Sequence, residues 1–191
     1  MIKREEIEAE LAPALDLIED EDLRKKVLDA WMLGIEQGGW ESVEQLKEMP
    51  FTVATETRGV NFLEHTLVVT RSAVAMAQAQ MEFYSKMPYE IDMDRLVAGG
   101  LLHDVGKLLE IERTPDGAHR KGRHGLHARH PVSGAILAAE AGLPEEIINI
   151  IACHAAEGEG RPQVVETVLI HQADFATFNP LVMMTKGLLI R

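Results

Sequence analysis

The residues best suited to chemistry in this 191-residue chain form the pentapeptide His103-Asp104-Val105-Gly106-Lys107. The pentapeptide follows an apolar run over residues 96–102, so it places an imidazole and a carboxylate side by side where a buried segment ends. Adjacent nitrogen and oxygen ligands can share one metal centre, and a helix continuing through the segment would bring Lys107 onto the same face. The alternative is an ordinary helix C-terminus with Gly106 as its cap.

Three further histidines and one aspartate could join this pair. His65 and His154 lie at helical spacing from apolar residues, so each faces the core side of its helix. Asp174 stands in an apolar stretch, where a carboxylate is costly to bury unless it is paired or binds a metal. His130 precedes Pro131 and a new helix. Each alone could be a core or loop residue, but together they form a mixed nitrogen and oxygen set that suits Fe, Mn, Co or Zn rather than Mg or Ca alone.

Helical periodicity dominates the segments that must position these residues. We expect helices over about residues 4–20, 22–37, 42–49, 61–80, 92–103 and 163–178, with two more that begin at Pro131 and Pro144 as first helical residues. The last helix is expected to end before Pro180. No segment shows strand alternation, and residues 113–130 are predicted to be a long irregular loop, a kind of segment that often carries function.

Composition and charge exclude several classes of protein. Hydrophobic residues make up 46% of the chain, and the net charge of −12 opposes binding to a nucleic-acid duplex. The single cysteine, Cys153, excludes a scaffold of intramolecular disulfides. No apolar run approaches the roughly 18 residues that a membrane span needs, and the N-terminus lacks the apolar segment of a signal peptide. We therefore expect a cytoplasmic protein that binds neither a membrane nor a duplex.

The order His65, His103-Asp104, Asp174 resembles the H…HD…D signature of the HD-domain metal-dependent phosphohydrolases, over roughly residues 60–180. The pentapeptide also resembles the HD-x-G-K form that is common in this superfamily. The resemblance implies an all-α fold, an HD-domain helical bundle with a five-helix core. We place this domain at residues 51–191 and an N-terminal helical extension, packed on the core, at residues 1–50.

The resemblance also implies a metal site. His130-Pro131 and His154 stand where binuclear members place two extra histidines, so two divalent transition-metal ions are expected, bridged by Asp104. The first ion would be held by His65, His103, Asp104 and Asp174, and the second by Asp104, His130 and His154. Iron or manganese is expected, and cobalt, nickel or zinc would also suit these ligands.

The implied activity is hydrolysis of a nucleotide or another small phosphate ester or anhydride by a water that the metals activate. Lys107 is predicted to contact the phosphate, the alternative being a solvated helix-end cation. Residues 113–129 carry five basic residues against Asp116 alone, which suits an anionic substrate and a lid over the metals. The predicted substrate-binding cations are Lys107, Arg120, Lys121, Arg123 and Arg129. Three histidines of this segment, His119, His124 and His127, are predicted to be solvated, and His171 to support the site or the core.

Two other functions stay open. Cyclic-di-GMP phosphodiesterases of the HD-GYP branch have two consecutive histidines followed by Glu, whereas Cys153 takes the first position here and the Glu is absent. Asn61 also lacks the carboxylate that some members of that branch use for a further metal, so cleavage of a cyclic dinucleotide is the lesser alternative. The second is a metal-binding or nucleotide-binding regulatory module without turnover. Cys153 is predicted to be a buried structural thiol, and residues 1–50 and 181–190 could cap the core or form a homodimer contact.

Overall fold

Helices form nearly all the regular structure of residues 2–190, the part of the chain that the computed structural model describes. The all-α prediction is confirmed. The α-helices are α1 (Arg4–Leu15), α2 (Glu21–Gly38), α3 (Val43–Glu48), α4 (Phe62–Phe83), α5 (Met93–Leu102), α6 (Lys107–Glu110), α7 (Arg123–His127), α8 (His130–Glu140), α9 (Glu145–Cys153) and α10 (Val165–Thr185). A 3₁₀ turn, η1 (Ala156–Gly158), follows α9. Within residues 2–190, no helix is both long and apolar enough to cross a membrane.

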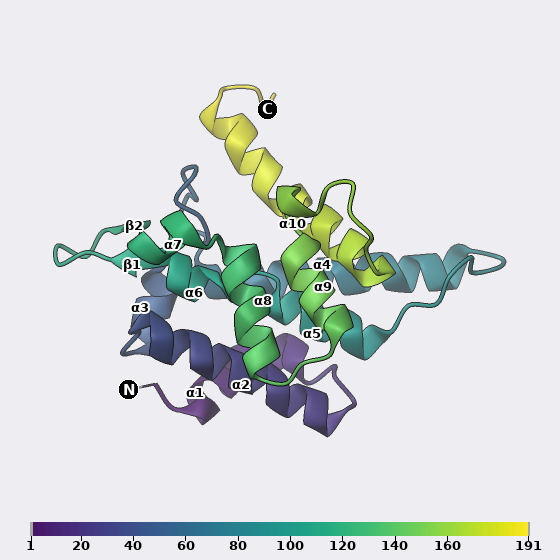
Figure 1. The fold of residues 1–191 in the computed structure, drawn as a ribbon. Coiled ribbons are helices and arrows are strands. Elements are labelled where there is room, and N and C mark those ends of the chain that lie inside the picture. The colour runs from purple at the N-terminus through teal and green to yellow at the C-terminus, as the bar shows by residue number, and fades with distance from the viewer. Residues whose placement is uncertain (1, 191) are drawn as a thin grey trace.

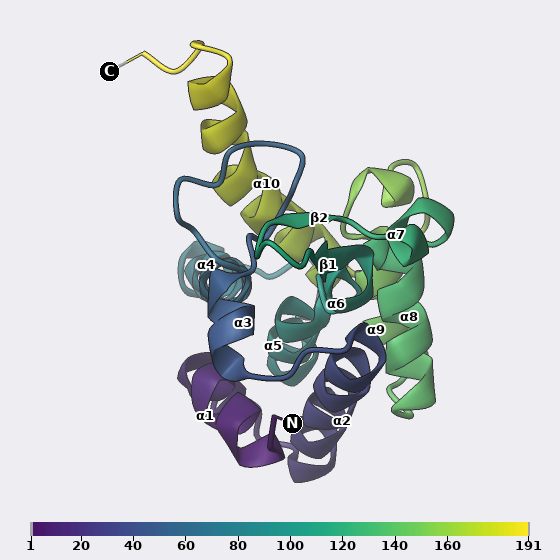
Figure 2. The same ribbon diagram turned by 90° about the vertical axis from the view of Figure 1, so that its left-hand side faces the viewer.

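Helix α5 lies at the centre of the molecule, with α4 on one side, α8 and α9 on the other, and α10 across one end (Figure 1 and Figure 2). All of its residues from Leu96 to Leu102 are buried. A helix that is apolar on every side is stable only when neighbours surround it. The chain therefore places the HD pair, which follows α5 directly, in the middle of the bundle.

The N-terminal helices α1 and α2 share one continuous hydrophobic core with the later helices. The Trp31 ring packs at 5.3 Å from the Phe62 ring, and its indole N–H donates to the Leu101 carbonyl at 3.0 Å. Trp40 likewise donates to the Leu108 carbonyl at 2.9 Å. These two bonds satisfy carbonyls on either side of the HD pair, so residues before position 50 help to fix the turn that carries it. A boundary at residue 50 stays a prediction.

Most helix starts follow their sequence signals. Asp20, Ser42, Asn61 and Asp92 each accept a hydrogen bond from a backbone N–H in the first turn of the helix that follows. Two predictions at helix starts were wrong by one residue. Helix α8 begins at His130 and not at Pro131, and Pro144 is the N-cap of α9 and not its first helical residue.

The predicted end of the last helix was also wrong, because α10 continues through Pro180 to Thr185. Proline removes only one helical hydrogen bond, the one that the carbonyl of Ala176 would accept. Ala176 and Pro180 are exposed, and the second half of α10 extends past the rest of the molecule in Figure 2, so water can bond the free carbonyl.

The expected loop over residues 113–130 contains regular structure, which corrects that prediction. Strands β1 (Ile111–Arg113) and β2 (His119–Lys121) form an antiparallel hairpin, with Glu112 opposite Arg120. Helix α7 and the start of α8 follow. Each strand has only three residues, too few for alternation to be recognised in the sequence.

The HD segment is a turn, so the predicted helix that continues through residues 103–107 was wrong. Helix α5 ends at Leu102, residues 103–106 form turns, and α6 begins at Lys107. Gly106 has φ −65°, so it is not the left-handed cap that a helix C-terminus favours. Its role is close packing, because a Cβ there would lie 2.2 Å from the His130 carbonyl oxygen and 2.5 Å from the Gly134 nitrogen.

Replacing Gly106 with alanine should lower the free energy of unfolding by about 1–3 kcal/mol, the usual cost of overpacking. The added methyl group would press against the backbone of α8, which cannot turn away as a side chain can. Urea unfolding of the variant measures this loss, and Gln78→Ala on the exposed face of α4 serves as the control. A Gly106→Ala protein as stable as the parent would contradict the close approach of this turn to α8.

Candidate metal centre

All six predicted metal ligands meet in one place, although they come from five helices. His65 lies in the first turn of α4, and His130 is the first residue of α8. The His103-Asp104 pair follows the last residue of α5, His154 follows that of α9, and Asp174 lies within α10. Five of the six lie at or next to helix ends, which lets several helices contribute to one small volume.

Two compact groups of donor atoms share Asp104. The groups are His65, His103 and Asp104, and Asp104, His130 and His154, and within each the donors lie within 4.8 Å of one another. The Asp104 Oδ2 atom lies 3.4 Å from His65 Nε2 and 3.3 Å from His103 Nε2. The Oδ1 atom lies 3.4 Å from His130 Nε2 and 3.6 Å from His154 Nε2. Each carboxylate oxygen therefore faces its own pair of imidazoles.

Asp174 reaches this arrangement from α10. Its Oδ1 atom lies 3.1 Å from His65 Nε2, so the carboxylate adjoins the first group and not the second. The side chain is 15% exposed, whereas Asp104 is 1% exposed. Asp174 thus stands between the buried donors and solvent.

Several buried polar atoms in the centre have no hydrogen-bond partner. They are Nε2 of His65, His103 and His154, and Oδ1 of Asp104. Buried polar atoms are nearly always hydrogen-bonded, so four unpaired atoms that face one another need a ligand. The Nδ1 atoms of His103 and His154 bond the carbonyl oxygens of Gly100 at 2.7 Å and Ile151 at 2.8 Å. A carbonyl only accepts, so Nδ1 carries the proton and Nε2 keeps a lone pair, as a divalent transition metal requires.

The charges in the centre are arranged to keep both aspartates ionised. Burial alone would raise the pKa of Asp104, but the Lys107 ammonium and His103 outweigh it and hold that pKa well below its usual value. Burial likewise opposes ionisation of Asp174, yet the adjacent His65 imidazole, whose Nε2 lies 3.1 Å from Asp174 Oδ1, lowers its pKa to about 2. The pKa of His65 is raised, because its contacts with Asp104 and Asp174 exceed the opposing effect of burial. The carboxylates are therefore ready to bind a cation at neutral pH.

Lys107 pairs directly with Asp104 in this structure. Its Nζ lies 2.5 Å from Asp104 Oδ2 and 5.5 Å from the centre of the Phe51 ring. The Phe51 ring also stacks on the imidazole of His65, with ring centres 4.0 Å apart, and is itself 1% exposed. Phe51 thus fixes both a ligand and a cation. Sequence reasoning missed it, because it lies between helices α3 and α4 where no periodicity marks a buried residue.

A cleft of about 530 Å³ opens above these residues, within the range typical of small-molecule sites. Its cations are Lys107, Lys121 and Arg129, and its acidic residues are Glu110, Glu157 and Asp174. The remaining lining is mostly apolar and includes Phe51, Val53, Ile111, Ala155, Phe175 and Phe178. The cleft can therefore accept a molecule with an anionic end and an uncharged ring.

The predicted substrate-binding cations separate into two sets. Lys107, Lys121 and Arg129 line the cleft, whereas Arg120 and Arg123 are not among its lining residues. Arg120 pairs with Glu112 across the hairpin at 2.7 Å. The excess of positive charge in this segment is also smaller than the sequence suggests, because Lys121 lies 3.4 Å from Glu110 and Arg129 lies 2.9 Å from Glu157.

The other histidines of the basic segment take no part in the donor groups found among residues 2–190. His119 stacks against Trp40 with ring centres 6.2 Å apart, and His124 and His127 lie on α7. His171, in contrast, supports the centre, since its Nδ1 lies 2.6 Å from the His154 carbonyl oxygen. Cys153 is half-buried and not fully buried as predicted, and partial burial raises the pKa of its thiol.

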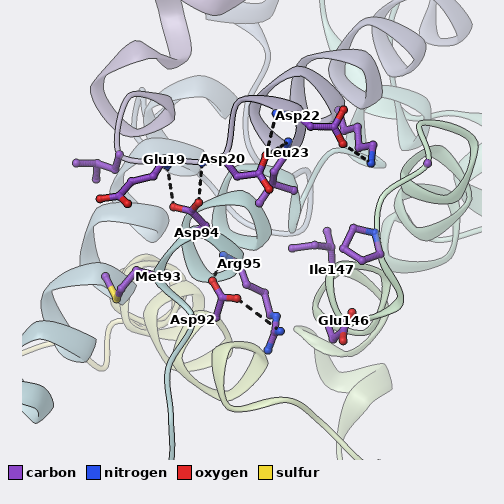
Figure 3. Close-up of a pocket in the computed structure, with 14 residues that line it drawn as sticks. Glu19, Asp20, Asp22, Leu23, Asp92, Met93, Asp94, Arg95, Glu146 and Ile147 are labelled. Atoms are coloured by element: carbon purple, nitrogen blue, oxygen red, sulfur yellow. Dashed lines mark hydrogen bonds and ion pairs between the residues drawn. The ribbon is translucent and has the colours of Figure 1, made fainter.

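A second cavity, of about 640 Å³, lies at the other end of the molecule between the α1–α2 loop, the start of α5 and the α8–α9 loop (Figure 3). Its carboxylates already have structural roles. Asp94 accepts hydrogen bonds from the backbone N–H groups of Glu19 and Asp20, each at 2.8 Å. Asp20 caps α2, and Asp92 caps α5. Three of its acidic residues, Asp20, Asp92 and Asp94, are therefore accounted for by backbone hydrogen bonds.

Comparison with known proteins agrees with this geometry. The family model described as "HD domain" matches residues 62–175. The chain is 32% identical over 167 residues to a dihydroneopterin 2′,3′-cyclic phosphate phosphodiesterase of Methanocaldococcus jannaschii. It is 34% identical over 116 residues to ribonuclease Y of Pseudothermotoga lettingae and to that of Thermotoga petrophila. A search of solved structures gave no significant match.

The coverage of these relatives is unequal. The match to the archaeal phosphodiesterase takes in 83% of this chain and 64% of that protein, and the match to each ribonuclease Y takes in 61% of this chain and 18% of the ribonuclease. The family model begins at the first residue of α4 and ends one residue after Asp174, so it contains every predicted metal ligand. With that match over more than half of its length, the chain belongs to the HD-domain family.

Proposed function

We propose that this protein is a metal-dependent phosphohydrolase that binds two divalent transition-metal ions and cleaves a small phosphate ester or anhydride. The observation that carries the proposal is the set of buried, unpartnered Nε2 and carboxylate oxygen atoms arranged around Asp104. One ion would be held by His65, His103, Asp104 and Asp174, and the other by Asp104, His130 and His154. Imidazole and carboxylate ligands favour iron or manganese among the ions that the cell supplies.

The residues around the centre would hold the metal ions and supply positive charge to the substrate. When bound, two adjacent cations stabilise negative charge on a phosphoryl group and increase the acidity of water. Lys107 is placed to balance charge on the phosphate oxygens, because its Nζ lies beside Asp104 and also lines the cleft. Lys121 and Arg129 add positive charge at the same cleft. Nothing in this scheme needs a nucleophilic side chain.

The substrate that fits best is a small phosphorylated compound that carries a ring, such as a nucleotide. Phe175 and Phe178 give the cleft an aromatic wall, and Lys107 and Lys121 give it cations. A relative named for a 2′,3′-cyclic phosphate of dihydroneopterin supports a cyclic phosphodiester as the bond that is cleaved. The volume of about 530 Å³ favours a small molecule over a polynucleotide, although other relatives are ribonucleases.

The location and assembly of the protein also follow from its charge and helices only as predictions. The net charge of −12 supports a protein without a duplex nucleic-acid partner. A cytoplasmic location, the lack of a membrane partner and a homodimer built on the N-terminal helices stay predictions.

The experiment is product release from a panel of substrates by protein reconstituted with Mn²⁺ or Fe²⁺. The panel holds nucleoside 2′,3′-cyclic and 3′,5′-cyclic phosphates, dihydroneopterin 2′,3′-cyclic phosphate, nucleoside triphosphates, a cyclic dinucleotide and a short RNA. We expect turnover of a small ring-bearing ester, lost after chelation and restored by metal. Preference for the cyclic dinucleotide or the RNA would replace our substrate class. Metal-loaded protein that cleaves no member of the panel would favour a regulatory binding module.

A further inference from the structure

Glu110, the last residue of α6, holds His130 in place although it belongs to neither donor group. It is 8% exposed. Its Oε2 atom accepts a hydrogen bond from the backbone N–H of His130 at 2.5 Å and lies 3.0 Å from His130 Nδ1. The opposite ring nitrogen, Nε2, lies 3.4 Å from Asp104 Oδ1. One carboxylate thus fixes both the backbone and the ring of this histidine.

The need for Glu110 follows from where His130 sits in its helix. His103 and His154 follow the ends of helices, and each bonds through Nδ1 to the carbonyl three residues earlier. His130 begins α8, so no carbonyl of its own helix precedes it. Its backbone N–H is also one of the unpaired donors of a helix N-terminus. Both acceptors must therefore come from outside α8, and Glu110 supplies them.

The same residue ties the basic hairpin to the centre. Its Oε1 atom lies 3.4 Å from the Nζ of Lys121, a cation of the cleft, and its carbonyl accepts from the Gly122 N–H at 2.8 Å. A Cβ on Gly125 of α7 would lie 2.6 Å from Glu110 Cγ, so α7 packs closely against it. Hydrogen bonds from His130 overcome the effect of burial and lower the pKa of Glu110 to about 2, which keeps it an acceptor.

We propose that Glu110 is a positioning residue that fixes the Nδ1–H form and the orientation of His130 and thereby completes the second donor group. The proposal rests on the proposed function in one respect, since it takes His130 to bind a metal. Carboxylates that orient a metal-bound histidine in this way typically account for a 10–100-fold difference in metal affinity. Lys121 connects the same carboxylate to the wall of the cleft.

The test compares Mn²⁺ binding by the parent, Glu110→Met, Glu110→Gln and the control Glu112→Met, with calorimetry and measured metal content. Glu112 lies two residues after Glu110. It stands on the solvent side of the hairpin, where it pairs with Arg120. We expect Glu110→Met to lower the affinity for one of the two Mn²⁺ ions about 10–100-fold and to leave the affinity for the other unchanged. Glu110→Gln, which keeps an acceptor, should recover part of that loss. Two ions bound by Glu110→Met as tightly as by the parent would overturn the proposal.

A second measurement needs no Glu110 variant and no bound metal. In metal-free protein with ¹⁵N-labelled histidine, NMR reports which ring nitrogen of His130 carries the proton, with His130→Gln identifying the signal. We expect the proton on Nδ1, held by Glu110. A proton on Nε2, or rapid exchange between the two forms, would overturn the proposal. If the parent binds no metal at all, the proposed function fails while this measurement still decides the role of Glu110.

Discussion

Asp104→Asn will remove metal from both donor groups and reduce turnover on the order of 10³-fold or more, since metal ions supply several kcal/mol of transition-state stabilisation. Among the described residues, only Asp104 has carboxylate oxygens that face both pairs of imidazoles. These oxygens lie 3.3 to 3.6 Å from the four Nε2 atoms. Asparagine keeps the shape but offers one neutral oxygen in place of a charged pair. The two donor groups should therefore fail together.

Metal content and product release, measured on the same samples, test this expectation. Asp22→Asn is the matched control, because Asp22 is exposed and pairs with Lys26 on α2, far from the donor groups in sequence. That control should keep both ions and full turnover. An Asp104→Asn protein that still binds two ions and turns over substrate would show that Asp104 does not bridge the groups.

Lys107→Met will lower kcat by about 10²–10³-fold, the usual loss when one group that stabilises transition-state charge is removed. It will also destabilise the metal-free protein by about 3–5 kcal/mol, because Asp104 would remain buried without its cation. The Lys107 side chain is 11% exposed and that of Asp104 is 1% exposed, so water can compensate little of this loss. Bound metal cations would replace the missing positive charge, so the destabilisation should shrink in metal-loaded protein.

Urea unfolding with and without Mn²⁺ separates the two roles of Lys107, and initial rates give its effect on kcat. Lys86→Met, in the exposed loop after α4, is the control and should match the parent in every assay. Equal destabilisation of Lys107→Met in the presence and absence of metal would refute the role of Lys107 as the counter-ion of Asp104. An unchanged kcat would refute its contact with the phosphate.

The sequence alone predicted the long helices and a candidate set of metal ligands. Helical periodicity is a local signal, so α2, α3, α4 and α5 begin within one residue of the starts predicted at residues 22, 42, 61 and 92. The predicted ligands all lie within residues 62–175, which the "HD domain" model matches. Their role in binding metal stays a prediction.

Only the tertiary structure decided which cations and which supporting residues reach the site. Arg120 and Lys121 are neighbours in sequence, but side chains of adjacent strand residues point to opposite faces, so only Lys121 lines the cleft. Glu110 and Phe51 lie outside any periodic pattern, and their roles depend on contacts with His130 and His65 from helices far along the chain. The continuation of α10 through Pro180 depends likewise on the solvent around that helix, because water must bond the carbonyl that proline leaves free. Local sequence specifies which residues can form a helix or bind a metal, but long-range packing selects the partners that surround them.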